Sequence, residues 1–315
     1  MPTAAGVRIT WPDLPSRVRA AVEEILGSPV TAYDAQSGGF SPGTADRVVT
    51  RDDDRAFVKA VGVELNEGSP GLHRREAAVS ARLPSDPRIP ALLGCYDDGD
   101  WVALVLEDVE GRHPTTPWVA AELDRVLKAL SGLAAVLTPN PVAHLRSARD
   151  ELTENFQGWS RVVASPPEEL DPWAARHLGR LVDLSAVGVR ALGGDTVVHV
   201  DLRADNLLLR PDGSVAVVDW PWACVGPAWL DTVLLLVNVE LFGGHDTDAL
   251  LESRVWPAGA GPTRSEVTAV LAGVAGYFVD AARLPPPAGL PTVRAFQQAQ
   301  AVSTLAWVRR RLTAS

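Results

Sequence analysis

The sequence predicts an α+β protein with a small, β-rich N-terminal part and a larger, mainly helical C-terminal part. Between residues 30 and 107, short apolar runs alternate with Gly- and Asp-rich turns, which is typical of strands. From residue 116 onward, apolar residues recur at helical spacing over long segments. A chain of 315 residues is long enough for two lobes. We therefore expect two domains, residues 1–110 and 111–315.

Composition and charge narrow the class of protein. Apolar residues make up 46% of the chain, charged residues 22%, and the net charge is −10, which indicates a globular protein and disfavours nucleic-acid binding. The longest apolar stretch, residues 233–242, is too short to span a bilayer, and the N-terminus does not resemble a signal peptide. The two cysteines, Cys95 and Cys224, have no metal-site spacing. We expect a cytoplasmic protein that binds neither membrane nor nucleic acid.

The first segments of the chain read as a helix and then a glycine-rich loop. Residues 12–27 have one apolar helical face. Gly38, Gly39 and Gly43 then lie between two strand-like runs, and the backbone N–H groups of such a loop can face an anion. An ordinary Gly-rich hairpin turn explains the same residues equally well.

Lysine is nearly absent from the chain. It occurs only at Lys59 and Lys128, and the other 27 basic residues are arginine. Lys128 has a charged-face position on a predicted helix, whereas Lys59 lies inside the apolar strand-like run 56–61. A lysine in such a run either extends its ammonium to the strand end or supplies the compact charge that a phosphate needs.

A helix, two strands and a linker follow Lys59. Glu76 lies on the apolar side of the predicted helix 70–83, although a surface charge pairing along the helix is an equally good interpretation. Residues 89–97 and 101–106 read as strands, and the polar segment 107–109 connects them to the helical part. The further helices are expected at 118–138, 172–192, 232–241, 265–284 and 291–312, with a helical insert within 142–159.

Residues 197–220 form a mainly apolar stretch that contains several polar residues. Two apolar runs separated by a Pro-Asp-Gly turn predict strand, turn and strand, with Asp201, Asn206 and Asp219 at one end. A carboxylate, an amide oxygen and a second carboxylate suit a hard cation such as Mg²⁺ together with a general base.

These motifs carry a resemblance to a known family. His199-x-Asp201-x-x-x-x-Asn206 followed by Asp219 resembles the protein-kinase catalytic loop and its metal-binding Asp. Trp220 after that Asp, and the Gly-Gly-Phe-Ser loop upstream, resemble the aminoglycoside phosphotransferase family of small-molecule kinases. The resemblance spans about residues 35–235. It implies a bilobal protein-kinase-like fold, with 1–110 as the nucleotide-binding N-lobe and 111–315 as the C-lobe.

The resemblance implies a nucleotide site in the N-lobe. The glycine-rich loop would cover the phosphates of ATP, with GTP as an open alternative. Lys59 would bind the α- and β-phosphates, and Glu76 would orient it. The hinge would hold the adenine through backbone groups. The implied loop and hinge residues are Gly38, Gly39, Phe40, Ser41, Glu107 and Val109.

The resemblance also implies the catalytic roles in the C-lobe. Asn206 and Asp219 would hold Mg²⁺, and Asp201 would accept or position the proton of the acceptor hydroxyl. His199 would support the loop by hydrogen bonds to the backbone. Asp231 would anchor the catalytic loop, or serve as a helix N-cap.

Some residues depart from the family pattern. Val200 stands where the family usually has Gly, and Arg203-Ala204-Asp205 replaces the usual His-Pro-Gly. Arg203 is expected either to contact the γ-phosphate or to pair with Asp205. The basic C-terminus, residues 307–315, is unlike members that act on aminoglycosides. The transferable expectation is therefore ATP- and Mg²⁺-dependent phosphorylation of a hydroxyl on a small molecule, such as an antibiotic or metabolite. The sequence leaves the oligomeric state open.

Three other functions fit part of the sequence. A nucleotide-binding pseudokinase or regulatory module would have lost the Lys, the base or the metal-binding Asp, and all three are present. A metal-dependent hydrolase that uses His199, Asp201 and Asp219 leaves Lys59 unexplained. A protein kinase would carry Asp-Phe-Gly and Ala-Pro-Glu elements, and neither follows Asp219.

Overall fold

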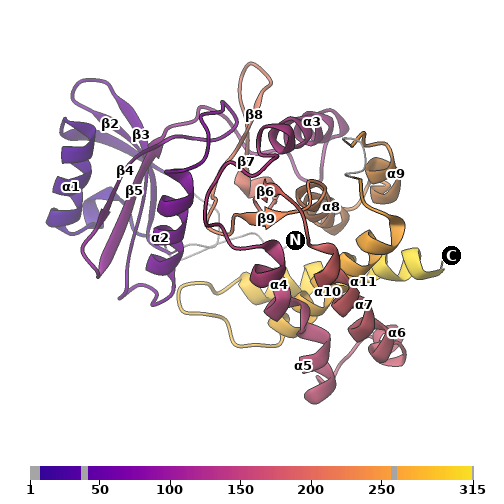
Figure 1. The fold of residues 1–315 in the computed structure, drawn as a ribbon. Helices are drawn as coiled ribbons and strands as arrows, with labels where there is room; N and C mark the ends of the chain where they lie inside the picture. Colours follow the sequence, from indigo (N-terminus) through magenta and orange to yellow (C-terminus); the bar gives the residue numbers. More distant parts are fainter. Residues whose placement is uncertain (1–7, 37–41, 257–260, 314–315) are drawn as a thin grey trace.

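The N-terminal part of the protein is a five-stranded antiparallel sheet with a helix on each face (Figure 1). The computed structural model describes residues 8–36, 42–256 and 261–313. The strand order is β1-β2-β3-β5-β4, so β3 is the central strand. The strands are β1 (Val30–Ala35), β2 (Thr44–Thr50), β3 (Arg55–Gly62), β4 (Leu92–Asp97) and β5 (Trp101–Glu107), and the helices are α1 (Ser16–Leu26) and α2 (Ser69–Ser80).

Alternation along β5 divides the core of this part into two layers. Trp101, Ala103 and Val105 face α1, whereas Val102 and Leu104 face α2, because successive side chains of a strand point to opposite faces. All of these side chains are buried. Since both faces are covered, β5 reads as a continuous apolar run rather than as an alternating one.

Helices form most of the remaining chain, and the predicted α+β fold class is confirmed. Helix α10 packs against α7 and α11, α8 packs against α11, and α3 contacts α8 (Figure 1). The boundary between domains at residue 110 stays a prediction. The helices are α3 (Ala120–Val136), α4 (Ala148–Phe156), α5 (Gly158–Ala164), α6 (Pro172–Arg176), α7 (Leu178–Ala191), α8 (Leu230–Phe242), α9 (Thr247–Glu252), α10 (Arg264–Ala282) and α11 (Val293–Thr313).

Helix α10 is the centre of the helical part. Among the described helices it has the length and hydropathy of a membrane span, but 67% of that window is buried inside the protein, as in a core helix. It approaches α5 closely at Gly158, where an added Cβ would lie 2.1 Å from the backbone oxygen of Gly276. Only glycine permits this contact between the two helices.

The polar stretch of residues 197–220 lies on a hairpin and an adjacent pair of strands. β6 (Thr196–Val198) pairs with β9 (Cys224–Gly226), and β7 (Leu207–Leu209) pairs with β8 (Val215–Val217). The predicted strand, turn and strand are therefore present. A 3₁₀ turn at Ala204–Asn206 leads into β7.

Two helix predictions need correction. The expected helix 172–192 is broken at His177, which leaves helical geometry with φ −117° and stacks on Trp173 with ring centroids 4.4 Å apart. The N-terminal helix begins at Ser16 rather than at residue 12, because a separate 3₁₀ turn occupies Trp11–Asp13. Periodicity alone did not show either interruption.

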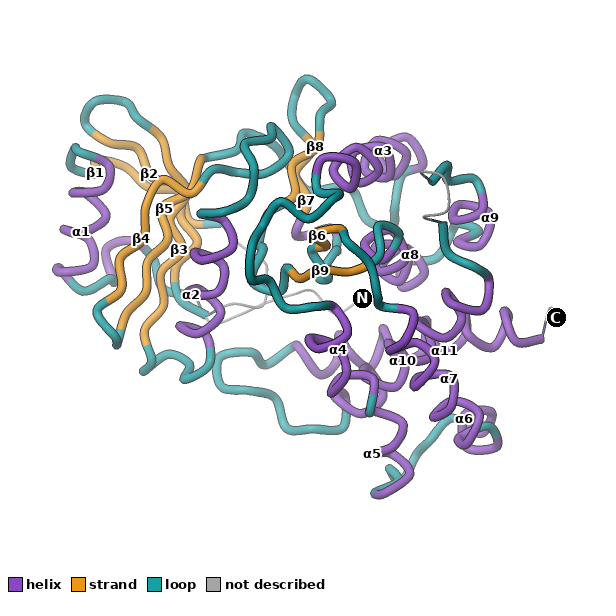
Figure 2. The backbone as a smooth tube through the Cα atoms, in the orientation of Figure 1, coloured by secondary structure: helices purple, strands orange, loops and turns teal. Residues whose placement is uncertain are grey.

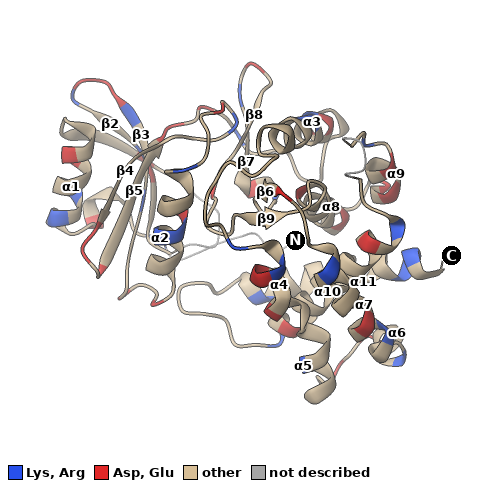
Figure 3. Cartoon of the chain, in the orientation of Figure 1, with Lys and Arg blue, Asp and Glu red and all other residues tan. Residues whose placement is uncertain are grey.

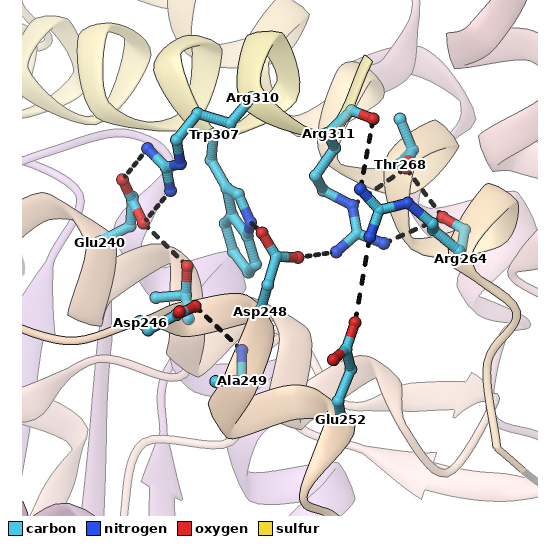
Figure 4. Close-up of polar contacts among 11 residues, drawn as sticks. Glu240, Asp246, Asp248, Ala249, Glu252, Arg264, Thr268, Trp307, Arg310 and Arg311 are labelled. Carbon is cyan, nitrogen blue, oxygen red and sulfur yellow. Dashed lines mark hydrogen bonds and ion pairs between the residues drawn. The ribbon is translucent and has the colours of Figure 1, made fainter. Parts of the chain in front are cut away.

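Ion pairs connect the basic C-terminal residues to neighbouring helices (Figure 4). Arg310 pairs with both carboxylate oxygens of Glu240, each at 2.8 Å. Arg311 is buried, pairs with Asp248, and donates to the Thr268 hydroxyl at 3.0 Å. These arginines therefore serve the packing of α11 against α8, α9 and α10.

The connector between α10 and α11 returns to the N-terminal part. Figure 2 shows this loop extending toward the start of α2. There the side-chain amide of Asn66 donates to the backbone oxygen of Ala288 at 2.8 Å. The contact closes one side of the space between the sheet part and the helical part.

Candidate active site

Lys59 lies at the centre of the site, on the middle strand of the sheet. Its Nζ atom lies 2.5 Å from Oε2 of Glu76 on α2, and it also pairs with Asp219 after β8. The side chains of Lys59 and Glu76 are only 12% and 3% exposed. Three segments far apart in the sequence therefore meet at one ammonium group, and Glu76 is not the surface charge that the helix pattern also permitted.

The electrostatics of this cluster keep Lys59 charged. Burial alone lowers the pKa of an ammonium, but Asp219 and Glu76 raise the pKa of Lys59 above its ordinary value. Burial raises the pKa of Glu76 despite the opposing charge of Lys59. Burial also opposes ionisation of Asp219, but Lys59 lowers the pKa of that carboxyl to about 2. Asp219 is therefore ionised at neutral pH.

Asp231 fixes the backbone of the segment expected to be the catalytic loop. One carboxylate oxygen accepts the amide of His199 at 2.8 Å, and the other accepts the amide of Val200 at 2.9 Å. Helix α8 begins at Leu230 with Trp229 as its N-cap, so Asp231 anchors the loop rather than capping the helix. The bonds hold Val200 at φ 72°, in the left-handed region that a β-branched residue rarely adopts.

His199 supports the loop from inside. Its side chain is fully buried and packs edge-on against Trp220, with centroids 4.7 Å apart. Nε2–H donates to the backbone oxygen of Val218 at 2.9 Å, and Nδ1 accepts the amide of Asp201 at 3.2 Å. Both ring nitrogens are therefore used by the backbone, as expected for a supporting residue.

Asp201 is surrounded by Asn206 and Arg203. Asn206 donates its side-chain amide to the backbone oxygen of Asp201 at 2.8 Å and to its carboxylate at 3.3 Å. Arg203 pairs with Asp201 and binds Asp205 through two bonds of 3.0 Å. Burial opposes the charge of Arg203, but these two carboxylates raise its pKa. Of the two roles expected for Arg203, the pairing with Asp205 is present.

The cluster separates two adjoining cavities. A smaller one, of about 160 Å³, is lined by Asn206 and the hinge, and a larger one, of about 730 Å³, is lined by Asp201. Lys59, Glu76 and Asp219 line both. A group bound in the smaller cavity can therefore reach a molecule bound in the larger one at Asp219.

The predicted hinge borders the smaller cavity. Glu107, Asp108 and Val109 all line it. Arg47 donates to the backbone oxygen of Val109 at 2.6 Å and pairs with Asp108 at 3.0 Å, which holds the hinge against β2. The predicted loop residues Gly38, Gly39, Phe40 and Ser41 lie outside the described residues; the strands expected on either side of that loop are β1 and β2.

Two oxygens in the smaller cavity fit a hard cation. Asn206 uses its NH₂ group on Asp201, so its amide oxygen remains for a cation, and the ionised Asp219 lines the same cavity. Within the described residues, no group of three or more His, Cys, Asp and Glu gathers as a metal cage. Two protein oxygens completed by phosphate oxygens and water are the arrangement that Mg²⁺ commonly takes at nucleotides.

The sequence did not single out Arg8, which also lines the smaller cavity. Its segment bridges to the end of the glycine-rich stretch, where the amide of Ile9 donates to Gly43 at 3.3 Å. Burial lowers the pKa of Arg8, against the opposing charges of Asp219 and Asp46. No local pattern distinguishes this arginine from the many others, so only the fold places it here.

Comparison with known proteins identifies the family. The profile of the phosphotransferase enzyme family matches residues 39–266. No curated protein matches the sequence. Among solved structures, choline kinase from Streptococcus pneumoniae is similar with a TM-score of 0.61 and 15% identity, covering 95% of this chain and 98% of that one.

Two further structures show the same fold. An aminoglycoside phosphotransferase from Alicyclobacillus acidocaldarius has a TM-score of 0.51 and 16% identity, with 91% and 93% of the chains covered. An AMP-bound spectinomycin phosphotransferase has a TM-score of 0.52 and 11% identity, with 95% and 93% covered. The predicted protein-kinase-like architecture is thereby confirmed. Since the family profile covers more than half of the chain, the protein belongs to the phosphotransferase enzyme family.

Proposed function

We propose that this phosphotransferase moves the γ-phosphoryl group of ATP to a hydroxyl of a small molecule, with Mg²⁺ as the cofactor. The observation that carries the proposal is the cluster of Lys59, Glu76 and Asp219 at the junction of two cavities. The AMP bound to the related spectinomycin enzyme supports a nucleotide as the donor. The two free cysteines, Cys95 and Cys224, are compatible with the cytoplasm as its compartment.

The nucleotide would occupy the smaller cavity. Its base would lie beside the hinge, and its phosphates would approach Lys59, whose ammonium is held in place by Glu76. Asn206 and Asp219 would hold Mg²⁺, which when bound neutralises phosphate charge. Arg8 adds a second cation from the N-terminal segment.

The acceptor would occupy the larger cavity with a hydroxyl at Asp201. The hydroxyl oxygen forms a bond to the γ-phosphorus, and the bond from that phosphorus to the β–γ bridging oxygen breaks, so that ADP leaves. The hydroxyl proton passes to the carboxylate of Asp201. Asp231, through His199 and Val200, holds the loop that aims this carboxylate. Positioning and charge neutralisation are what phosphoryl transfer chiefly requires.

The proposal is tested by ADP formation from ATP and Mg²⁺ across a panel of hydroxylated compounds. Asp201→Asn should lower turnover by about 10²–10⁴-fold, the usual contribution of a general base. The affinity of this variant for ATP should be unchanged, because Asp201 lines the larger cavity and not the smaller one, where the nucleotide would bind. Asp124→Asn, on the exposed face of α3, is the matched control.

A regulatory nucleotide-binding module is the alternative. It predicts ATP binding without turnover on any acceptor, and the same behaviour in Asp201→Asn. That result would overturn the proposed function.

A further inference from the structure

The larger cavity has a mainly apolar wall. Side chains from α4, α8, α10 and α11 line it, and its volume of about 730 Å³ suits a drug-sized ligand. The connector before α11 closes its far side through the bond from Asn66 to Ala288. The apolar residues of this wall include Phe156, Leu234, Val274, Phe278 and Phe296.

Each carboxylate among the described lining residues of the cavity has a cationic partner within the protein, but two of these partners are shared. Glu151 lies outside the catalytic cluster; its side chain is 6% exposed and pairs with Arg75 at 3.0 Å and Arg146 at 3.1 Å. Lys59 is shared by Glu76 and Asp219, and Arg203 is shared by Asp201 and Asp205. Negative charge therefore exceeds positive charge at the Asp201 end of the cavity.

One aromatic ring of the lining is already in contact with a cation of the protein. The guanidinium carbon of Arg75 lies 5.0 Å from the ring centroid of Trp222. Tyr277 and Phe278 tilt against one another, with centroids 5.1 Å apart. A ligand that stacked on Trp222 at this position would have to displace Arg75.

Arg294 is the lining cation that no described carboxylate pairs with. Its Nε donates to the backbone oxygen of Pro285 at 3.1 Å, and one terminal nitrogen donates to the side-chain oxygen of Gln297 at 2.8 Å. Both partners are neutral. A guanidinium has five N–H donors, so donors remain for an oxygen of a bound molecule.

One wall connects Arg294 to the catalytic carboxylate. Gln297 donates its amide to the hydroxyl of Tyr277 at 3.3 Å. Burial raises the pKa of Tyr277, Asp201 adds to that effect, and Arg294 opposes it. Tyr277 therefore lies within electrostatic reach of both Asp201 and Arg294. The charge along this wall changes from negative at the site of transfer to positive at its other end.

We infer that the acceptor is a largely apolar hydroxy compound that lies along this wall, with its hydroxyl at Asp201 and a neutral or anionic oxygen-bearing end at Arg294. The inference rests on the proposed function and names its substrate class.

The test uses three ring alcohols that differ only in the far substituent: 4-hydroxycyclohexanecarboxylate, its methyl ester, and 4-aminocyclohexanol. Ligand-observed NMR measures their affinity for the full-length enzyme with ADP and Mg²⁺, so the ranking does not require turnover. We expect the carboxylate to bind at least about tenfold more tightly than the amine, a difference near 1.4 kcal/mol, with the ester between them. Arg294→Gln should abolish the preference, and Arg309→Gln, an exposed arginine of the same helix, should preserve it.

Each outcome decides the inference. Equal binding of the three compounds, no binding of any, or preference for the amine overturns it. Arg294→Glu should reverse the ranking if the charge of this residue sets it. If the ranking holds while no hydroxy compound yields ADP, the proposed function fails and the charge preference of the cavity stands.

Discussion

Nζ of Lys59 lies 2.5 Å from Oε2 of Glu76, and the same ammonium pairs with Asp219, 160 residues further along the chain. The sheet, helix α2 and the segment after β8 are thus connected at a single buried charge. Elsewhere, Figure 3 shows acidic and basic residues interspersed along both the sheet part and the helical part of the chain.

Glu76→Gln tests the orientation of Lys59. Glutamine keeps the size of the side chain but loses a charge-assisted hydrogen bond worth about 1.5–3 kcal/mol. We expect kcat/KM for ATP to fall by about 10–100-fold. Steady-state kinetics measures this, and Glu67→Gln, exposed just before α2, should leave kcat/KM unchanged. A drop shared by both variants would contradict the assigned role.

Val200→Gly tests the strain in the catalytic segment. Val200 has φ 72°, and a left-handed conformation costs a non-glycine residue about 1–2 kcal/mol. Glycine removes that cost but adds roughly 0.5–1 kcal/mol of backbone entropy. The free energy of unfolding in urea should stay the same or rise by up to about 1.5 kcal/mol. Val198→Gly, a buried position of β6, should instead lower it by about 2–4 kcal/mol.

Arg311→Ala tests the attachment of α11. Arg311 is 3% exposed and bonds to Asp248, Thr268 and the backbone oxygen of Arg264. Removing it leaves buried acceptors unpaired, and we expect a loss of about 3–5 kcal/mol in unfolding free energy. Arg310→Ala removes a pair whose arginine is 52% exposed, so its loss should be about 1 kcal/mol or less. Equal effects of the two substitutions would show that burial does not set the difference.

Asp46→Asn tests a buried carboxyl in β2. Asp46 is 1% exposed, and burial raises its pKa to about 6, against the effects of the Trp11 amide and Arg8. The folded state therefore binds more protons than the unfolded state between pH 3.8 and about 6, and stability falls as pH rises through this range. The free energy of unfolding of the variant should equal that of the wild type near pH 4. At pH 7.5 it should be higher than that of the wild type by up to about 3 kcal/mol.

Urea unfolding from pH 4 to pH 8 measures this difference. Asp54→Asn, in the exposed turn before β3, should follow the wild-type profile at every pH. A constant difference between Asp46→Asn and the wild type would show that the carboxyl does not titrate in this range.

Most of the fold could be predicted from the sequence because its signals are local. Strands β2 to β5 are bounded by Asp- and Gly-rich turns, and α3 and α7 repeat apolar residues at helical spacing. The break at His177 escaped prediction because it interrupts an otherwise helical pattern and is stabilised by stacking on Trp173. The short helix α9 was not predicted because its six residues are too few to show a helical periodicity of apolar residues.

Some residues of the candidate site could likewise be predicted from the sequence, and others could not. Lys59 stood out because lysine is so rare in this chain, and Asp201, Asn206 and Asp219 stood out by their spacing; the structure brings all four around two adjoining cavities. Arg8 could not be predicted, because neither rarity nor spacing distinguishes it from the many other arginines of the chain.

By itself, the sequence determined which chemical groups are present and in which order, because residue type and spacing are properties of the chain. Only the tertiary structure decided that Asp231 binds two successive amides and that Arg203 pairs with Asp201 and Asp205. It alone decided that Arg294 lines the larger cavity. The wall of that cavity comes from segments between residues 59 and 300, whose shared surface has no period along the chain. The charge of this wall depends on which side chains pair with one another after folding.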